Sequence, residues 1–221
     1  LTIINDAVQQ IREEEPDFDI DLVSDNDPAT FAMLAEGKTQ GVFQLESYGM
    51  RQMLREFKPR NIDDILAAIA LYRPGPMDSI PRYIECRHDP SKIVYDTPLL
   101  EPILKQTYGC AVYQEQVMQI FREVAGYSFG HADIVRRAMS KKKADVLESE
   151  RESFISGAAQ RGVDAQTATK LFDDLANFAN YAFNKSHAAA YAVLSYRTAY
   201  LKAHYPCEYF SALLTSVLGN Q

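Results

Sequence analysis

Five basic residues in an eight-residue run form the densest cluster of positive charge in the sequence. The run covers residues 136–143 and comprises Arg136, Arg137, Lys141, Lys142 and Lys143. On a helix, one of the arginines would share a surface with Lys141, so several donors could converge on a polyphosphate. A cationic clamp of this kind neutralises the charge that develops in phosphoryl or nucleotidyl transfer. The alternative is the solvated end of a helix, and the run taken alone favours that alternative.

A second cluster brings an amide, an amine, a hydroxyl and an imidazole together in four successive residues. These are Asn184, Lys185, Ser186 and His187, followed by a run of alanines that is typical of closely packed helix. We expect Ser186 to be the N-cap of that helix. A helix N-terminus with these side chains would suit a phosphate or a base edge, and nearby aromatic residues offer stacking faces. A histidine buried in the core explains His187 equally well.

Three alternating acids, Asp17, Asp19 and Asp21, suggest a third kind of chemistry. On an extended chain they would share one face and could hold two Mg²⁺ ions, as a two-metal nuclease does. A catalytic carboxylate set needs a rigid scaffold, however, and these acids lie in a polar segment next to three glutamates and a proline. We therefore expect them to solvate the chain rather than bind metal.

The elements that must position these residues are predicted to be helices. Apolar residues recur at three- and four-residue spacing, and capping residues and glycines fall between the segments. Asp27 and Asp164 are predicted N-caps, and a helix start at Thr97 is followed by a stop at Gly109. We expect a mainly α, compact multi-helix domain with little strand and with ordered loops at 71–77 and 180–185. The later helices are predicted at 116–125, 132–139, 144–159, 165–178, 186–203 and 206–217.

Charge is divided unevenly along the 221 residues. The net charge is −7, but residues 1–37 contain ten acids and one base, so the remainder carries a small positive charge. We expect the acidic stretch 13–27 to be a loosely ordered entry to the helical domain.

No apolar run is long enough to span a bilayer and no signal segment opens the chain, which favours a soluble, cytosolic protein. The three cysteines, Cys86, Cys110 and Cys207, lack metal or disulfide spacing, so we expect reduced packing residues.

Six motifs in order resemble one known family. They lie at 41–47 (GVFQLES), 71–77 (LYRPGPM), 108–120 (with VYQEQVMQI), 136–143 (RRAMSKKK), 183–191 (FNKSHAAAY) and 201–206 (LKAHYP). The sequence is similar, over essentially its whole length, to the fingers region of the alpha subunit of bacterial DNA polymerase III, the DnaE-type C-family replicative polymerase. The resemblance implies a fragment of a DNA-directed DNA polymerase, inactive alone.

The resemblance also implies roles for the two polar clusters. Arg136, Arg137, Lys141, Lys142 and Lys143 would bind the triphosphate of the incoming deoxynucleotide. The group Arg73, Asn184, Lys185, Ser186 and His187 would line the nascent base pair or template. Residues 1–37 would be an acidic entry segment and first helices after the palm, and 38–221 the helical fingers core.

Other partners implied by the resemblance lie outside this sequence. The Mg²⁺ ions would be held by palm aspartates that precede it, so the fragment itself would bind no metal. Primer-template DNA, the palm and thumb, and further replicase subunits including the sliding clamp would be its partners, in the bacterial cytoplasm and without a membrane. Ala182 and Ser140 stand where the family often has glycine, which puts the local loop geometry in doubt. A helical protein-interaction module without nucleotide binding remains the alternative.

Overall fold

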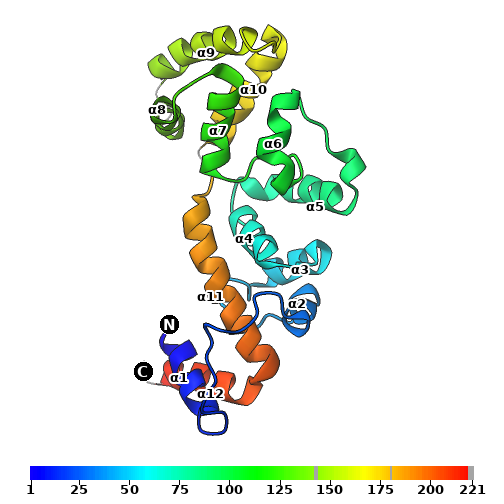
Figure 1. Cartoon of the computed structure of the whole chain (residues 1–221), viewed down its shortest axis with the longest axis vertical. Coiled ribbons are helices and arrows are strands. Elements are labelled where there is room, and N and C mark those ends of the chain that lie inside the picture. Colours follow the sequence, from blue (N-terminus) through cyan, green and yellow to red (C-terminus); the bar gives the residue numbers. More distant parts are fainter. Residues whose placement is uncertain (142–143, 180, 219–221) are drawn as a thin grey trace. The chain divides into compact units, whose positions relative to one another are not determined.

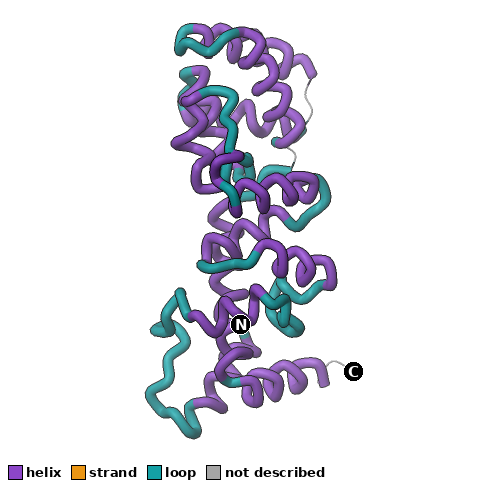
Figure 2. The backbone as a smooth tube through the Cα atoms, turned by 90° about the vertical axis from the view of Figure 1, so that its right-hand side faces the viewer, coloured by secondary structure: helices purple, strands orange, loops and turns teal. Residues whose placement is uncertain are grey.

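The structure, a computed structural model, describes residues 1–141, 144–179 and 181–218. Within these ranges it contains twelve α-helices and four short 3₁₀-helices, with no strand (Figure 1). The tube in Figure 2 likewise consists of helices and loops. The prediction of a mainly α fold is therefore confirmed.

Contacts between residues divide the chain into two units. The first unit comprises Leu1–Ile69 and Ser186–Gln221, and the second comprises Ala70–Lys185. The chain leaves the first unit within one helix and returns to it at the start of another. The predicted boundary after residue 37 concerns entry from a palm domain and stays a prediction.

The first unit is built on the packing of its two ends. The N-terminal helix buries Ile4, Ala7, Val8 and Ile11, and this apolar stripe packs against α12. Burial of this stripe is what holds a ten-residue helix that would be marginal alone. The helices of this unit are α1 (Thr2–Ile11), α2 (Pro28–Ala35), α3 (Tyr48–Phe57), most of α4 (Ile62–Leu71), α11 (Lys185–His204) after its first residue, and α12 (Pro206–Leu218).

The acidic stretch 13–27 is an ordered loop, so the expectation of loose order is wrong. The Tyr196 hydroxyl donates to the carbonyl of Ser24 at 2.6 Å, and the Tyr205 hydroxyl donates to a Glu15 carboxylate oxygen at 3.0 Å. Both tyrosines come from the far end of the sequence. The loop is therefore ordered by tertiary hydrogen bonds that its own composition does not reveal.

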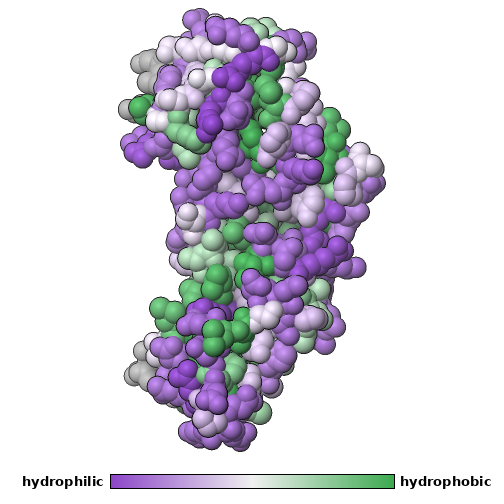
Figure 3. Space-filling view, viewed as in Figure 1, coloured by the Kyte–Doolittle hydropathy of each residue, from purple (hydrophilic) through white to green (hydrophobic). Residues whose placement is uncertain are grey.

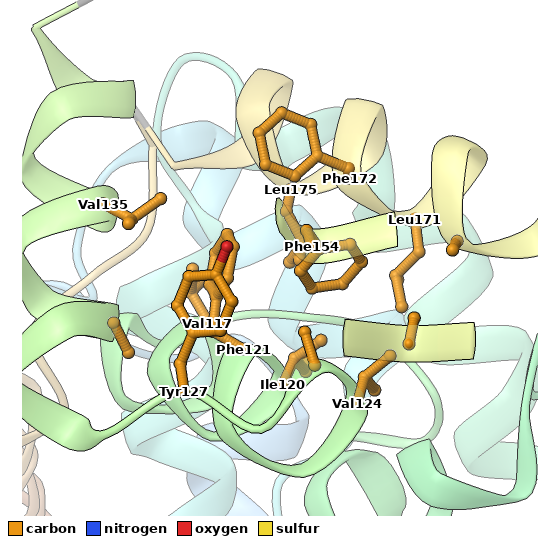
Figure 4. Packing of buried hydrophobic residues seen from close by; sticks show 14 of the residues in the cluster. Val117, Ile120, Phe121, Val124, Tyr127, Val135, Phe154, Leu171, Phe172 and Leu175 are labelled. Carbon is orange, nitrogen blue, oxygen red and sulfur yellow. The ribbon is translucent and has the colours of Figure 1, made fainter. Parts of the chain in front are cut away.

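The second unit is a helical bundle around an aromatic core. Phe121 and Phe154 meet edge to face with ring centroids 5.1 Å apart, and Phe172 packs against Phe154 at 5.6 Å. Figure 4 shows these rings directed into one space between their helices. The elements of this unit are the 3₁₀ turn Pro76–Ser79, α5 (Ile80–His88), the 3₁₀ turns Pro90–Lys92 and Pro98–Leu100, α6 (Glu101–Leu104), the 3₁₀ turn Lys105–Thr107, α7 (Gln114–Ala125), α8 (Phe129–Ser140), α9 (Ala144–Ala159) and α10 (Ala165–Phe178).

Helix boundaries follow the predicted signals where a side-chain cap exists. Asp27 accepts from the Thr30 backbone N–H at 2.7 Å, and Asp164 accepts from Thr167 at 2.9 Å. The helix predicted at 144–159 is confirmed at both ends. The single helix expected between Thr97 and Gly109 is wrong, because two 3₁₀ turns flank only one turn of α-helix there.

The cysteine prediction holds for two of the three residues. Cys86 and Cys110 are buried free thiols, and burial raises the pKa of Cys110 to about 11, so it stays protonated. Cys207 is also free but exposed, which corrects its assignment as a packing residue.

Hydrophilic side chains cover most of the face seen in Figure 3. In the part of the chain that the structure describes, every helix is too short or too polar to cross a bilayer.

Gly157 allows α9 to approach the end of α7. A Cβ atom at this position would lie 2.2 Å from the Ala125 carbonyl oxygen, whereas one at Gly130 in α8 would meet no atom within 4 Å. We expect Gly157→Ala to lower the free energy of unfolding by about 1–3 kcal/mol, because the backbones must separate. Urea unfolding of the chain measures this.

The matched control is Gly130→Ala, which adds the same methyl group to an exposed helical position. It should be neutral or stabilising by up to about 1 kcal/mol. Equal effects of the two substitutions would contradict the close approach of α7 and α9.

Candidate functional site

The loop 181–185 is held along its backbone by residues 112–115, an association that unites two of the sequence motifs. Phe183 donates to the Val112 carbonyl at 3.2 Å and accepts from the Gln114 backbone N–H at 2.9 Å, in a parallel bridge. The Gln114 side chain also donates to the Ala182 carbonyl at 3.1 Å. The register of the loop is therefore set by main-chain pairing as well as by its side chains.

Arg73 holds the same loop from the other side. Its guanidinium donates to the carbonyls of Ala70 at 3.2 Å and Tyr181 at 2.9 Å, and it lies 4.0 Å from the centroid of the Phe183 ring. Burial lowers the pKa of Arg73. These contacts join the motif at 71–77 to the loop, and they commit the Arg73 donors to protein carbonyls. Contact of Arg73 with a template remains a prediction.

The Pro-Gly-Pro turn after Arg73 packs against the ring of Tyr181. Gly75 has φ +98°, and a Cβ atom there would lie 2.3 Å from that ring. Glycine is required because both the backbone conformation and the contact exclude a side chain.

Lys185 begins α11 and is engaged through both its backbone and its side chain. Its N–H donates to the two Glu115 carboxylate oxygens at 3.1 and 3.2 Å, so this helix N-terminus already has an anionic partner. Its ammonium group donates to the Gln106 side chain at 3.1 Å and lies 5.4 Å from the Tyr113 ring centroid. Asn184, just before it, is exposed.

Ser186 and His187 are exposed residues of the first unit. The expectation that Ser186 is the N-cap is wrong, because α11 begins one residue earlier, at Lys185. His187 is not a core histidine, and its ring lies 4.3 Å from that of Tyr191. The boundary between the units falls just before Ser186, so only Asn184 and Lys185 share a unit with Arg73.

The basic run occupies the end of α8 and is partly neutralised by Asp133. This carboxylate pairs with Arg136 at 2.7 Å and with Arg137 at 2.7 Å. The Arg136 side chain is 13% exposed, whereas that of Arg137 is 67% exposed. Lys141 follows α8 and is exposed. Lys142 and Lys143 lie outside the described residues.

Ser140 joins the end of α8 to the segment that leads into the loop. Its hydroxyl contacts the carbonyls of Arg136 at 3.1 Å and Ala179 at 3.0 Å. Neither Ser140 nor Ala182 has a positive φ, so their backbone conformations do not require glycine. The end of the basic helix is thus hydrogen-bonded to Ala179, shortly before the loop 181–185, within one unit.

The three alternating acids do not form an extended, metal-binding face. Residues 17–21 form turns, in which the Asp21 N–H donates to Asp19 at 2.9 Å, and Asp21 also pairs with Arg197. Among the described residues, no three His, Cys, Asp or Glu side chains gather where they could hold a metal ion.

The polar segment 113–116 contains side chains whose partners the sequence does not specify. Gln116 is buried and accepts from the backbone N–H groups of Val112 and Tyr113 at 2.9 and 3.0 Å. Its amide donates to the Ile103 carbonyl and the Thr107 hydroxyl. A glutamine three residues after a helix start was the available signal. The spacing of Asp133 three and four residues before Arg136 and Arg137 in a predicted helix could have indicated its ion pairs. No signal pointed to the pairing of Glu115.

Comparison with known sequences decides the family. The sequence model described as "Bacterial DNA polymerase III alpha subunit finger domain" matches residues 1–162. The chain belongs to this family.

Curated relatives agree with this assignment. DNA polymerase III subunit alpha of Halalkalibacterium halodurans is 50% identical over all of this chain and 20% of its own length. The protein of the same name from Thermus aquaticus is 51% identical over 97% of the chain and 18% of its length, and that from Borreliella burgdorferi is 48% identical over the whole chain and 19% of its length. The chain thus spans about a fifth of these relatives.

Replacing Arg73 tests how strongly it anchors the loop. Lysine keeps the charge but cannot bond two carbonyls with a planar fork. We expect Arg73→Lys to lower the free energy of unfolding by about 1–2 kcal/mol. Arg60→Lys, at an exposed position, should change it by less than about 0.5 kcal/mol in the same urea titration. Identical curves for Arg73→Lys and wild type would refute the anchoring role.

The pairing of Asp133 should make the free energy of unfolding depend on pH in the acidic range. Hydrogen bonds from Arg136, then from Arg137, lower the pKa of this carboxyl. Because the pKa is lower in the folded state, ionised Asp133 stabilises the fold. This stabilisation is fully present above the pKa of an ordinary carboxyl group, and it is lost as the pH falls through the lowered pKa. Between about pH 5 and pH 2, the unfolding free energy should fall less steeply for Asp133→Asn than for wild type. Urea titrations across that range measure both slopes, and equal slopes would contradict the pairing.

Proposed function

We propose that this fingers domain binds the incoming deoxynucleoside triphosphate and the templating base, and closes over the nascent base pair. The observation that carries the proposal is the hydrogen bond, inside one unit, from Ser140 at the basic end of α8 to Ala179, shortly before the clamped loop 181–185. The first supplies cations and the second supplies exposed polar groups next to aromatic rings. The polymerase is a DNA-directed DNA polymerase, and this chain alone is inactive.

Arg137 is the best placed of the described cations to meet a triphosphate. It is the more exposed arginine, and its planar guanidinium can bond two phosphate oxygens at once. Arg136 is more buried and shares Asp133 with it, so we assign it to the support and electrostatic potential of the site. Lys141 adds positive potential, together with Lys142 and Lys143 of the same run. Asp133 competes with the phosphates for both arginines and must yield when nucleotide binds.

The second group acts at the base pair. Asn184 and Lys185 lie at the end of the clamped loop, with Ser186 and His187 on the first turn of α11. Arg73 supports the loop from behind. Closure of such a domain excludes water and tests base-pair shape before chemistry.

Metal ions and other partners belong to the rest of the polymerase. Phosphoryl-type transfer combines metal ions with positioned cations, and we assign the Mg²⁺ ions to aspartates of the palm. Primer-template DNA, palm and thumb are the immediate partners, while the sliding clamp and other replicase subunits contact other regions. We place the polymerase in the bacterial cytoplasm, at the replisome.

Alanine substitution at Arg136 and Arg137 in the full-length polymerase tests the proposal. We expect kcat/KM for the incoming nucleotide to fall on the order of a hundredfold for the double variant, because positioned cations stabilise the transition state. Arg137→Ala should account for most of the loss. Primer-template affinity should change little.

Arg151→Ala is the control, because Arg151 lies in the same unit and also pairs with a carboxylate, that of Asp173. It should leave nucleotide kinetics unchanged. Normal kinetics for the Arg136/Arg137 variant would overturn the triphosphate role and favour the alternative, a helical protein-interaction module without nucleotide binding.

A further inference from the structure

Hydrogen bonds join residues 112–115 to the segment 182–185 on both sides of Asn184. Ala182 and Phe183 are held by Gln114 and Val112, and the Lys185 N–H is held by the Glu115 carboxylate. Asn184 lies between the two points of attachment and is exposed. The contacts of Gln114, Val112 and Glu115 therefore hold the backbone on either side of it.

On the helix side of Asn184, the Glu115 side chain anchors the first N–H of α11. The carboxylate accepts from the first N–H of α11 with both oxygens, where negative charge interacts favourably with the helix dipole. Glu115 is itself placed by Gln116, its neighbour, whose buried side chain holds the start of α7. The backbone that carries Glu115 is therefore held in place by the hydrogen bonds of Gln116.

We infer that Glu115 is a positioning residue, which holds Asn184 and the start of α11 in the place where they meet the nascent base pair. This inference rests on the proposed function and adds a residue that need not touch nucleotide or DNA. A small displacement of a group that positions the substrate lowers the reaction rate, even when the mutated residue is remote from the chemistry. Loss of the Glu115 anchor should lower the rate by displacing Asn184 in this way.

Single-turnover incorporation by the full-length polymerase tests the inference. We expect Glu115→Ala to lower kcat/KM for the incoming nucleotide about ten- to a hundredfold, with unchanged primer-template affinity and an unchanged unfolding temperature. Glu115→Gln keeps an acceptor oxygen and should restore most of the activity. Glu123→Ala, on the same helix, removes an exposed carboxylate that pairs with its neighbour Arg122 and should have no effect.

A double-mutant cycle with Asn184→Ala separates positioning from general damage. If Glu115 acts through Asn184, the double variant should lose no more activity than Asn184→Ala alone. Independent, multiplicative losses, or a loss that accompanies a lower unfolding temperature and is not rescued by glutamine, would overturn the inference. Wild-type activity of Glu115→Ala beside defective Arg136/Arg137 variants would reject the positioning role and leave the proposed function intact.

Discussion

The buried side chain of Gln116 is the point on which the site in the second unit depends. It bonds four groups at once, two N–H groups through its oxygen and a carbonyl and a hydroxyl through its nitrogen. Because a buried amide must satisfy all of these or pay for desolvation, the start of α7 has one arrangement. That arrangement presents Gln114 and Glu115 to the loop 181–185. Gln114 and Glu115 then hold the loop together with Arg73.

The pairing of Asp133 with two arginines is a second constraint in the same unit. The basic end of α8 is not an unopposed cluster, because Asp133 pairs with both of its arginines. In the absence of an anion this pairing limits repulsion between neighbouring cations and keeps Arg136 largely buried. An anion that bound here would therefore replace an internal partner instead of filling a bare positive surface.

The sequence predicted the helices well because their signals are local. The residues 144–159 form a helix with the expected ends, and Asp27 and Asp164 cap their helices as expected. The predictions that were wrong concern segments whose structure depends on residues far away in the sequence. Ser186 is a good capping residue, yet α11 starts before it, at Lys185, whose N–H is bonded by Glu115, seventy positions away. The acidic loop 13–27 is ordered by tyrosines near the other end of the chain.

The sequence by itself determined the fold class, most helices and the family, because helical periodicity, capping and motif order are all written along the chain. It also marked which residues carry useful chemistry, from Arg73 to the basic run. Only the tertiary structure decided how these residues are used. Arg73 bonds two backbone carbonyls, and Glu115 occupies a helix N-terminus. A hydrogen-bonding side chain takes its role from the partner within about 3 Å, and spacing along the sequence does not specify that partner.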